Sequence, residues 1–138
     1  MIIDATNLIL GRLASFAAKK ALLGENIHII NCENAVISGS EENILERYKR
    51  KRQRGIPAKG PFIPRKPDMF VRRVIRGMLP YKKEKGRKAF ERIKCYIGIP
   101  ENFKDKKSET IAEADVSKLP NLMYVKVKNI CELLGAKL

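Results

Sequence analysis

The charge of residues 47–88 is the feature that most restricts how this chain can fold. The segment carries seventeen Lys and Arg residues against only two acidic ones, Asp68 and Glu84. Because unpaired charges are costly to bury, we expect most of the segment to lie at the surface. Residues 1–46 have a net charge of −3 and residues 89–138 one of +2, so this one segment accounts for the whole excess behind the overall +14. Such a localised excess predicts an anion-binding surface.

The composition predicts a folded protein of a reducing compartment. A chain of 138 residues suits one domain, residues 1–138, and 44% hydrophobic residues argue against general disorder. Cys32, Cys95 and Cys131 are odd in number and far apart, so we expect buried thiols and neither a disulfide framework nor a metal site. Neither a signal peptide nor an apolar run of membrane-spanning length is recognisable. We therefore expect a cytoplasmic protein with no membrane partner.

Hydrophobic periodicity and turn residues predict strands that alternate with helices. Strands are expected at residues 1–4, 27–31, 35–38, 93–97 and 124–127. Helices are expected from Thr6 or Asn7 to Gly24, from Ser38 or Ser40 to Arg54 with a Ser38–Glu41 capping box, from Pro67 or Asp68 to Leu79, from Gly86 to Arg92, and from an Asn129 cap to Gly135. This order predicts an α/β domain with a mostly parallel sheet.

Each element of the basic segment is predicted to expose cations. The helix that ends near Arg54 has no apolar residue from Lys49 onward, so its end must project into solvent or onto a partner. Residues 55–67, GIPAKGPFIPRKP, hold four of the seven prolines, which exclude a helix and favour an extended, semi-rigid loop. The next helix has an apolar face of Val71, Val74, Ile75 and Met78, and an opposite face of Arg72, Arg73 and Arg76.

If these cations converge, they form a surface for the phosphates of folded RNA. The sequence has no zinc finger, leucine zipper, clear helix-turn-helix or aromatic RNP strand, so RNA recognised by shape is favoured over DNA or single strands. A merely solvated charged face is the alternative. The predicted RNA-binding residues are Arg47, Lys49, Arg50, Lys51, Arg52, Arg54, Lys59, Arg65, Lys66, Arg72, Arg73, Arg76, Lys82, Lys83, Lys85, Arg87 and Lys88.

A few other residues have more than one possible role. Phe62 and Ile63 either wedge against RNA or pack the loop onto the domain, and we expect packing because loop aromatics usually anchor their own chain. His28 lies between isoleucines in a predicted strand, so we expect a packed histidine rather than a catalytic one. Asp4 and Glu33, near strand ends, are expected to have structural or capping roles rather than to form an acidic pair.

A nucleotide-using enzyme is the hypothesis with the least support. The GRLA stretch after the first strand lacks the G-x-G-x-x-G spacing that close approach to a pyrophosphate requires, and the chain has no G-x-x-x-x-G-K-[ST] sequence. We therefore expect no enzymatic activity, no cofactor and no small-molecule substrate.

Seven short motifs occur in a recognisable order along the chain. They are GRLAS (11–15), LLG (22–24), ISG (37–39), KGPF (59–62), RGMLP (76–80), Gly86 and GIP (98–100). Together they resemble the thirteenth protein family of the large ribosomal subunit, in its archaeal and eukaryotic branch. The resemblance spans roughly residues 2–135, and RGMLP followed by a basic stretch and a glycine is its most specific part.

The resemblance implies a three-layer α/β/α domain with a central parallel sheet. It also implies a non-enzymatic protein that binds large-subunit ribosomal RNA, has ribosomal proteins as neighbours and joins early in subunit assembly. The matching positions implied to face RNA are Lys59, Arg65, Arg76, Lys82, Lys83, Lys85, Arg87 and Lys88. Val71 and Tyr81 stand where relatives often have tryptophan and histidine, so packing near the third helix is expected to differ. A free RNA-binding translational regulator is the alternative function, because the same surface would serve it.

Overall fold

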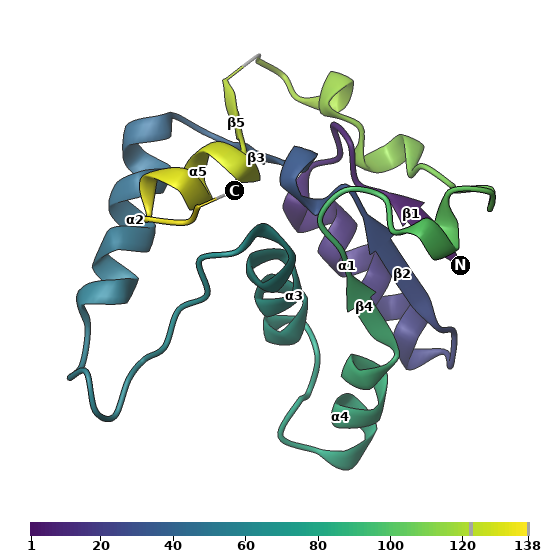
Figure 1. Cartoon of the computed structure of the whole chain (residues 1–138), viewed down its shortest axis with the longest axis horizontal. Coiled ribbons are helices and arrows are strands. Elements are labelled where there is room, and N and C mark those ends of the chain that lie inside the picture. The colour runs from purple at the N-terminus through teal and green to yellow at the C-terminus, as the bar shows by residue number, and fades with distance from the viewer. Residues whose placement is uncertain (122, 138) are drawn as a thin grey trace.

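Two small sheets organise the computed structural model of the chain, which describes residues 1–121 and 123–137. Strands β1 (Ile2–Asp4), β2 (Ile27–Ile30) and β4 (Ile93–Cys95) form a parallel sheet in the order β1-β2-β4 (Figure 1). Strands β3 (Val36–Ser38) and β5 (Tyr124–Lys126) form a separate antiparallel pair. The predicted α/β class and parallel sheet are confirmed, and two of the predicted strands belong to the second sheet.

The five helices fall into two groups around these sheets (Figure 1). Helices α1 (Leu10–Leu22), α3 (Pro67–Gly77) and α4 (Glu84–Glu91) pack around the parallel sheet, with α1 in contact with both of the others. Helices α2 (Glu41–Gln53) and α5 (Val127–Leu133) contact each other beside the β3–β5 pair. Short 3₁₀ turns, η1 to η4, cover Cys32–Asn34, Glu101–Phe103, Ala112–Ala114 and Val116–Lys118.

The core lies between the parallel sheet and its helices. Successive side chains of a strand point to opposite faces, and Ile3, Ile29 and Ile93 are buried together with the apolar face of α1 and with Val71 of α3. On the other face, His28 packs against Phe103 of η2, with ring centroids 4.9 Å apart. The helical face of the sheet therefore forms the main core.

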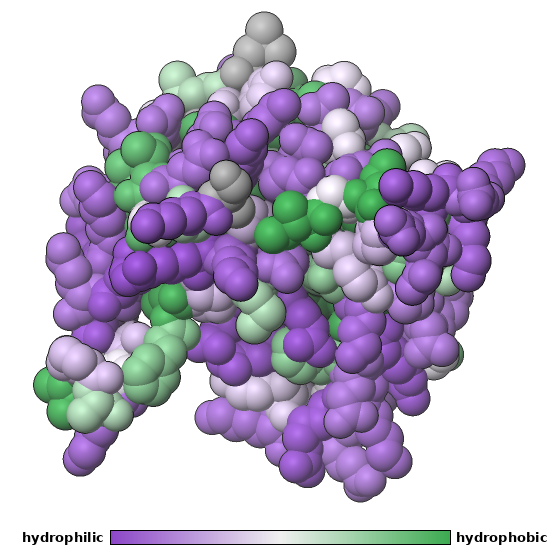
Figure 2. Space-filling view, viewed as in Figure 1, coloured by the Kyte–Doolittle hydropathy of each residue, from purple (hydrophilic) through white to green (hydrophobic). Residues whose placement is uncertain are grey.

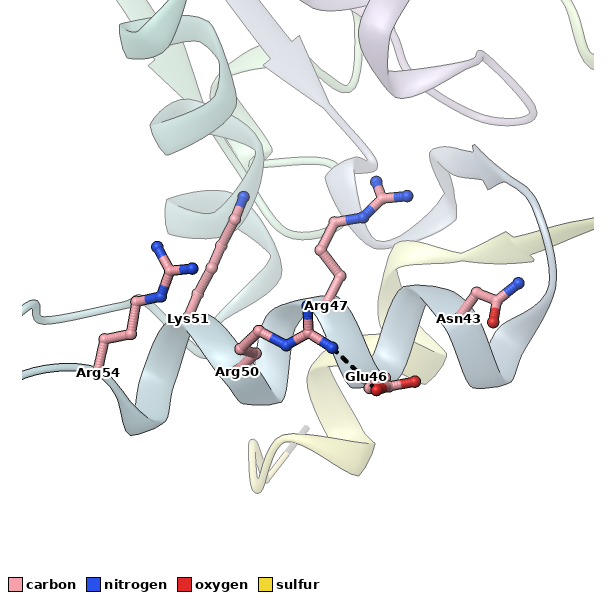
Figure 3. A pocket seen from close by; sticks show the side chains of 6 residues that line it. All are labelled: Asn43, Glu46, Arg47, Arg50, Lys51 and Arg54. Atoms are coloured by element: carbon pink, nitrogen blue, oxygen red, sulfur yellow. Dashed lines mark hydrogen bonds and ion pairs between the residues drawn. The ribbon is translucent and has the colours of Figure 1, made fainter.

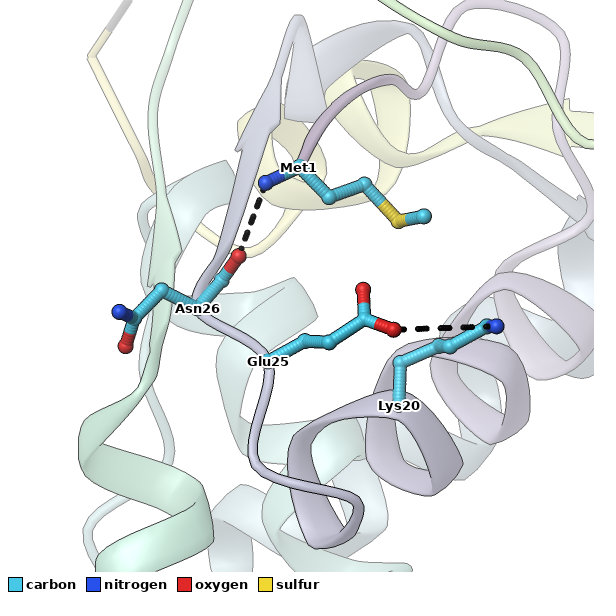
Figure 4. A network of polar contacts seen from close by, with 4 residues as sticks. All are labelled: Met1, Lys20, Glu25 and Asn26. Carbon is cyan, nitrogen blue, oxygen red and sulfur yellow. Dashed lines mark hydrogen bonds and ion pairs between the residues drawn. The ribbon is translucent and has the colours of Figure 1, made fainter.

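The edge of the sheet beside the N-terminus is closed by backbone and terminal contacts. The N-terminal ammonium donates a hydrogen bond to the carbonyl of Asn26 at 3.0 Å, and Lys20 lies 3.9 Å from Glu25 at the end of α1 (Figure 4). On the outer side of β1, the Asp4 amide donates to the Glu109 carbonyl at 2.9 Å. The ammonium and Asp4 contacts hold the two sides of β1, and the Lys20–Glu25 pair spans the turn between α1 and β2.

Several helix starts differ from the sequence prediction. The predicted Thr6 or Asn7 cap of α1 is wrong: Asn7 has a φ of 60°, and Thr6 donates to Asp4 in a turn that delays the helix to Leu10. The predicted Ser38–Glu41 capping box is also wrong, because Ser38 pairs in β3 and the hydroxyl of Ser40 accepts from the Asn43 amide at 3.3 Å.

Two further predicted boundaries, both in the second half of the chain, are wrong. The last helix begins at Val127 directly after β5, so Asn129 lies inside it and is not its cap. Helix α4 begins at Glu84, two residues before the predicted start at Gly86. Gly86 is buried within α4, where an added Cβ would lie 2.0 Å from the carbonyl oxygen of Pro80. Glycine is therefore required at position 86 because the backbone of α4 approaches the backbone of Pro80 closely.

Candidate nucleic-acid interface

The basic elements extend to one end of the molecule. In Figure 1 the C-terminal end of α2 and the tip of the loop of residues 54–66 lie at the lower left, the turn that leads into α4 lies at the bottom, and the C-terminal end of α3 lies between them. Hydrophilic side chains cover the bottom of the molecule in Figure 2, whereas the loop at the lower left, which a hollow separates from it, is largely apolar. We call this end the basic surface; it consists of the exposed Lys and Arg residues between 47 and 88. The basic surface is thus contributed by elements that are distinct in the fold.

Helix α2 presents a row of cations along one side. Arg47, Lys51 and Arg54 follow helical spacing and extend in the same direction (Figure 3), where they line a hollow of about 280 Å³. Arg50 instead donates to the carboxylate of Glu46 at 3.0 Å (Figure 3). Such an exposed pair contributes little stability and is easily exchanged for a phosphate contact. The row is therefore free to contact an anion.

The loop between α2 and α3 divides into an exposed tip and an anchored return. Its tip is a turn in which the amide of Gly60 donates to the carbonyl of Ile56 at 2.9 Å and Lys59 is exposed. Ile63 is half-buried between α2 and α3, so the packing prediction is correct for this residue. It is wrong for Phe62, which is 67% exposed. Arg65 and Lys66 are exposed beyond the anchored part.

Two of the predicted arginines hold the fold together instead of facing outward. Arg72 is half-buried: it donates to the carbonyls of Ile93 at 3.1 Å and Phe90 at 3.3 Å, and its guanidinium lies 4.1 Å from the centroid of the Phe90 ring. Arg52 is half-buried and donates to the carbonyl of Leu134 after α5. The prediction that Arg72 projects from the outer face of its helix is wrong. Both guanidiniums are already occupied by backbone carbonyls.

The remaining α3 arginines are half-buried at the edge of the basic surface. Arg76 lies with its guanidinium 4.5 Å from the centroid of the Tyr81 ring, so this tyrosine supports the arginine. Arg73 lines a groove between α2 and α3. Met78, predicted to pack in the core, is 43% exposed, and its neighbour Leu79 is buried in its place. Helix α3 ends at Gly77 and not at Leu79 as predicted, so Met78 lies outside the helix and does not continue its apolar face.

The turn into α4 carries cations that are almost all unpaired. Lys82, Lys83, Lys85 and Arg87 are exposed and form no ion pair with any described residue. Lys88 lies 3.2 Å from Glu84, one helical turn away. Among the ion pairs of the described residues, this is the one that involves a cation of the turn. Counterions or a polyanion must therefore balance its charge in solution.

The residues considered for other chemistry have structural roles. Burial alone would raise the pKa of Asp4, but hydrogen bonds from Thr6 and Asn31 outweigh it and hold that pKa below its usual value. Glu33 accepts from the Gly98 amide at 3.0 Å, so the prediction of structural roles is confirmed for both acids, although neither caps a helix. His28 lies 3.2 Å from the Tyr96 hydroxyl, and burial together with nearby positive charges lowers its pKa.

Metal and redox sites are equally unsupported by the described residues. The three cysteines are free thiols, and burial, with Asp68 and Glu132 nearby, raises the pKa of Cys131 to about 12. No cluster of three potential ligands for a metal ion occurs among residues 1–121 and 123–137. Within the same ranges, no helix is both long enough and apolar enough to cross a membrane.

An apolar groove inside the basic surface was not predicted. Tyr48, Ile63, Phe70 and Val74 line it, together with residues at the end of α3, and it encloses about 420 Å³. Sequence periodicity assigns such residues to helix faces that pack inward, but it does not show whether another element covers them completely. Here the loop covers the space between α2 and α3 only in part.

Comparison with known proteins identifies close similarity over almost the whole chain. Residues 1–102 match the family model described as ribosomal protein L13. The chain is 50% identical over 136 residues to a protein of Methanopyrus kandleri (97% of this chain, 86% of the relative) and 47% identical over 137 residues to one of Methanosarcina barkeri (99% and 98%). It is 42% identical over 135 residues to a protein of Archaeoglobus fulgidus (97% and 86%). Each of these relatives is named large ribosomal subunit protein uL13.

Proposed function

We propose, from the premise that this chain belongs to the ribosomal protein L13 family, that its basic surface binds the RNA of the large ribosomal subunit. Membership makes the chain a structural constituent of that subunit, located on the ribosome, and not an enzyme. The observation that carries the RNA-binding proposal is that exposed cations, most of them without an ion pair among the described residues, come from α2, the loop and the turn into α4 at the same end of the fold. We further propose that residues 1–138 act as one domain whose segment 47–88 faces the RNA.

The mechanism is electrostatic and steric. Lys and Arg side chains release condensed counterions when they contact phosphates, which supplies affinity, and the fit of the surface to folded RNA supplies location. The basic surface neutralises phosphates of RNA helices that otherwise repel one another. Holding those helices together favours an assembled arrangement, so we propose a role early in subunit assembly, beside neighbouring ribosomal proteins.

The proposed contacts fall into two classes. Direct phosphate contacts are assigned to Arg47, Lys49, Arg50, Lys51, Arg54, Lys59, Arg65, Lys66, Arg73, Arg76, Lys82, Lys83, Lys85, Arg87 and Lys88. Arg52 and Arg72 are assigned as positioning residues, because their guanidiniums already bind backbone carbonyls. The original set of seventeen is thereby divided into residues that bind and residues that shape the surface.

Crosslinking inside assembled large subunits tests this proposal. Subunits are irradiated, the RNA is digested, and the peptides of this chain that retain nucleotides are identified by mass spectrometry. We expect the attached nucleotides to concentrate in residues 47–88, with residues 1–46 as the internal control because they are net negative. Crosslinks spread evenly along the chain, or mostly within 1–46, would contradict it.

Co-sedimentation separates the ribosomal role from the alternative of a free translational regulator. A structural constituent remains with large subunits through a sucrose gradient in moderate salt. A free regulator is recovered instead in messenger complexes that lack ribosomal RNA. Recovery of the chain entirely in that second fraction would refute the ribosomal role.

A further inference from the structure

The groove between α2 and α3 has a preformed aromatic wall. The ring of Tyr48 lies 4.7 Å from that of Phe70, centroid to centroid, and the buried Phe70 holds it in place. Ile63 and Val74 complete the apolar lining. The volume of about 420 Å³ lies within the roughly 300–1,000 Å³ of small-ligand clefts. The groove is therefore large enough for a planar ring, and its lining is suited to one.

Cations stand at the edge of this apolar space. The Lys51 ammonium lies over the Tyr48 ring, 5.0 Å from its centroid, so a cation–π contact holds this side chain where it lines the groove. Arg73 approaches from α3. Neither side chain forms an ion pair within the part of the chain that the structure describes. Lys51 also borders the hollow that Arg47 and Arg54 line (Figure 3), so the groove is continuous with the row of cations on α2.

We propose that this groove receives one unpaired base of the bound RNA, an inference that rests on the RNA-binding function proposed above. A nucleotide combines the two chemistries that the groove presents: a flat apolar ring for the Tyr48 wall, and flanking phosphates for Lys51 and Arg73. Base stacking on an aromatic side chain is tolerant of sequence. The inserted base therefore fixes the protein in one position on the RNA, which phosphate contacts alone do not do.

The charge of the surroundings favours RNA over a segment of a neighbouring protein. The groove lies between the cation row of α2 and Arg73 of α3, so an occupant that carries phosphates is attracted from both sides. An apolar protein tail would leave these cations without partners. The occupant is thus a nucleotide, and capture of a protein segment is an outcome that the test must exclude.

Filling the groove without changing its charge gives the sharpest test. Gly77 lines the groove, and a Cβ added there meets no atom within 4 Å. Gly77→Leu therefore places apolar bulk in the space of the base while every cation remains. Gly11→Leu is the matched control, because Gly11 also lies in a helix, is exposed and has no atom within 4 Å of an added Cβ. Affinity for large-subunit RNA is measured by filter binding at several salt concentrations, with thermal unfolding as the check of folding.

We expect Gly77→Leu to bind about tenfold more weakly than the unmodified protein, which is the size of the loss of one stacked base. The dependence of binding on salt is expected to stay the same, because no phosphate contact is removed. Gly11→Leu is expected to bind as the unmodified protein does. A folded Gly77→Leu protein with undiminished affinity overturns the inserted base and leaves the proposed function intact. Failure of the unmodified protein to bind RNA overturns the proposed function itself.

A crosslinking measurement with the unmodified protein provides a second, independent readout. Large subunits are assembled with RNA that contains 4-thiouridine and are irradiated at long wavelength. We expect nucleotides attached to the peptides that hold Tyr48 and Val74. Absence of nucleotides from these two peptides, while other peptides of residues 47–88 carry them, overturns the proposal.

Discussion

Substitution of Gly86 by alanine tests the close approach of α4 to the preceding turn. A Cβ at this position would lie 2.0 Å from the carbonyl oxygen of Pro80, 2.2 Å from its carbonyl carbon and 2.8 Å from the amide nitrogen of Tyr81. Real Cβ contacts are essentially never shorter than 3.0 Å, so these backbone atoms must separate by about 1 Å. Because all three are backbone atoms, no side chain can rotate away to relieve the contact.

The magnitude follows from two opposing terms. Forcing an extra carbon into a well-packed site costs about 1–3 kcal/mol. Alanine gains back about 0.5–1 kcal/mol over glycine from helix propensity. We therefore expect Gly86→Ala to lower the free energy of unfolding by about 1–2 kcal/mol, which corresponds to a fall of roughly 3–8 °C in Tm for a chain of this size.

Urea denaturation followed by circular dichroism measures this change. We expect a lower midpoint with an unchanged slope, since the substitution alters stability and not the surface exposed on unfolding. Gly11→Ala is the control: Gly11 also lies in the first turn of its helix, but an added Cβ there meets no atom, so this variant should be as stable as the unmodified protein or slightly more so. Equal midpoints for Gly86→Ala and the unmodified protein would refute the close approach.

Three further variants, which replace four residues, test the roles of residues that shape the fold and of residues that bind. Arg72→Met removes two hydrogen bonds to backbone carbonyls. The free energy of unfolding measured by urea denaturation should therefore fall by about 1–3 kcal/mol, while the folded protein keeps its affinity for RNA. A strong loss of affinity would show that Arg72 contacts RNA. Replacing Lys82 and Lys83 together by glutamine should leave Tm unchanged and reduce the slope of log affinity against log salt by about 2, and an unchanged slope would remove these lysines from the interface. His28→Gln should flatten the dependence of the free energy of unfolding on pH between about pH 7.5 and 5.5. The pKa of His28 is lowered in the folded protein. As the pH falls below about 6.5, the unfolded state therefore takes up the proton first, and the unmodified protein loses stability. A profile that falls equally steeply in the variant would contradict this assignment.

The sequence predicts the order and type of the elements because their hydrophobic patterns are strong. The strands around Ile3 and Ile29 and the helix that begins at Pro67 occur where the patterns place them. Helix starts are less predictable, since several capping residues stand close together and tertiary contacts choose among them. Ser40 and not Ser38 caps α2, because Ser38 belongs to β3 and pairs there with Tyr124 of β5, 86 residues further along the chain.

The candidate site is also only partly predictable from the sequence: the position of its charge is, and the contacts of individual side chains are not. The position of the basic surface along the chain follows from the charge of residues 47–88, because so many like charges cannot be buried. An arginine can bind a backbone carbonyl only where the fold brings a helix end or a strand edge within its reach. Local sequence patterns do not predict these positions. Arg72 and Arg76 are one helical turn apart, yet one reaches Ile93 while the other lies over Tyr81. The apolar groove depends in the same way on the path of a loop.

The contact of Arg72 with Ile93 also bears on the protein before it joins the large subunit. Among the described residues, β4 pairs with β2 alone, so its other side is an open sheet edge. Open edges are templates for strand addition by another copy, and proteins commonly protect them with charge. The guanidinium of Arg72 occupies the carbonyl of Ile93 on that edge and places a positive charge beside it. The edge is thereby guarded against aggregation while the newly made chain is still free.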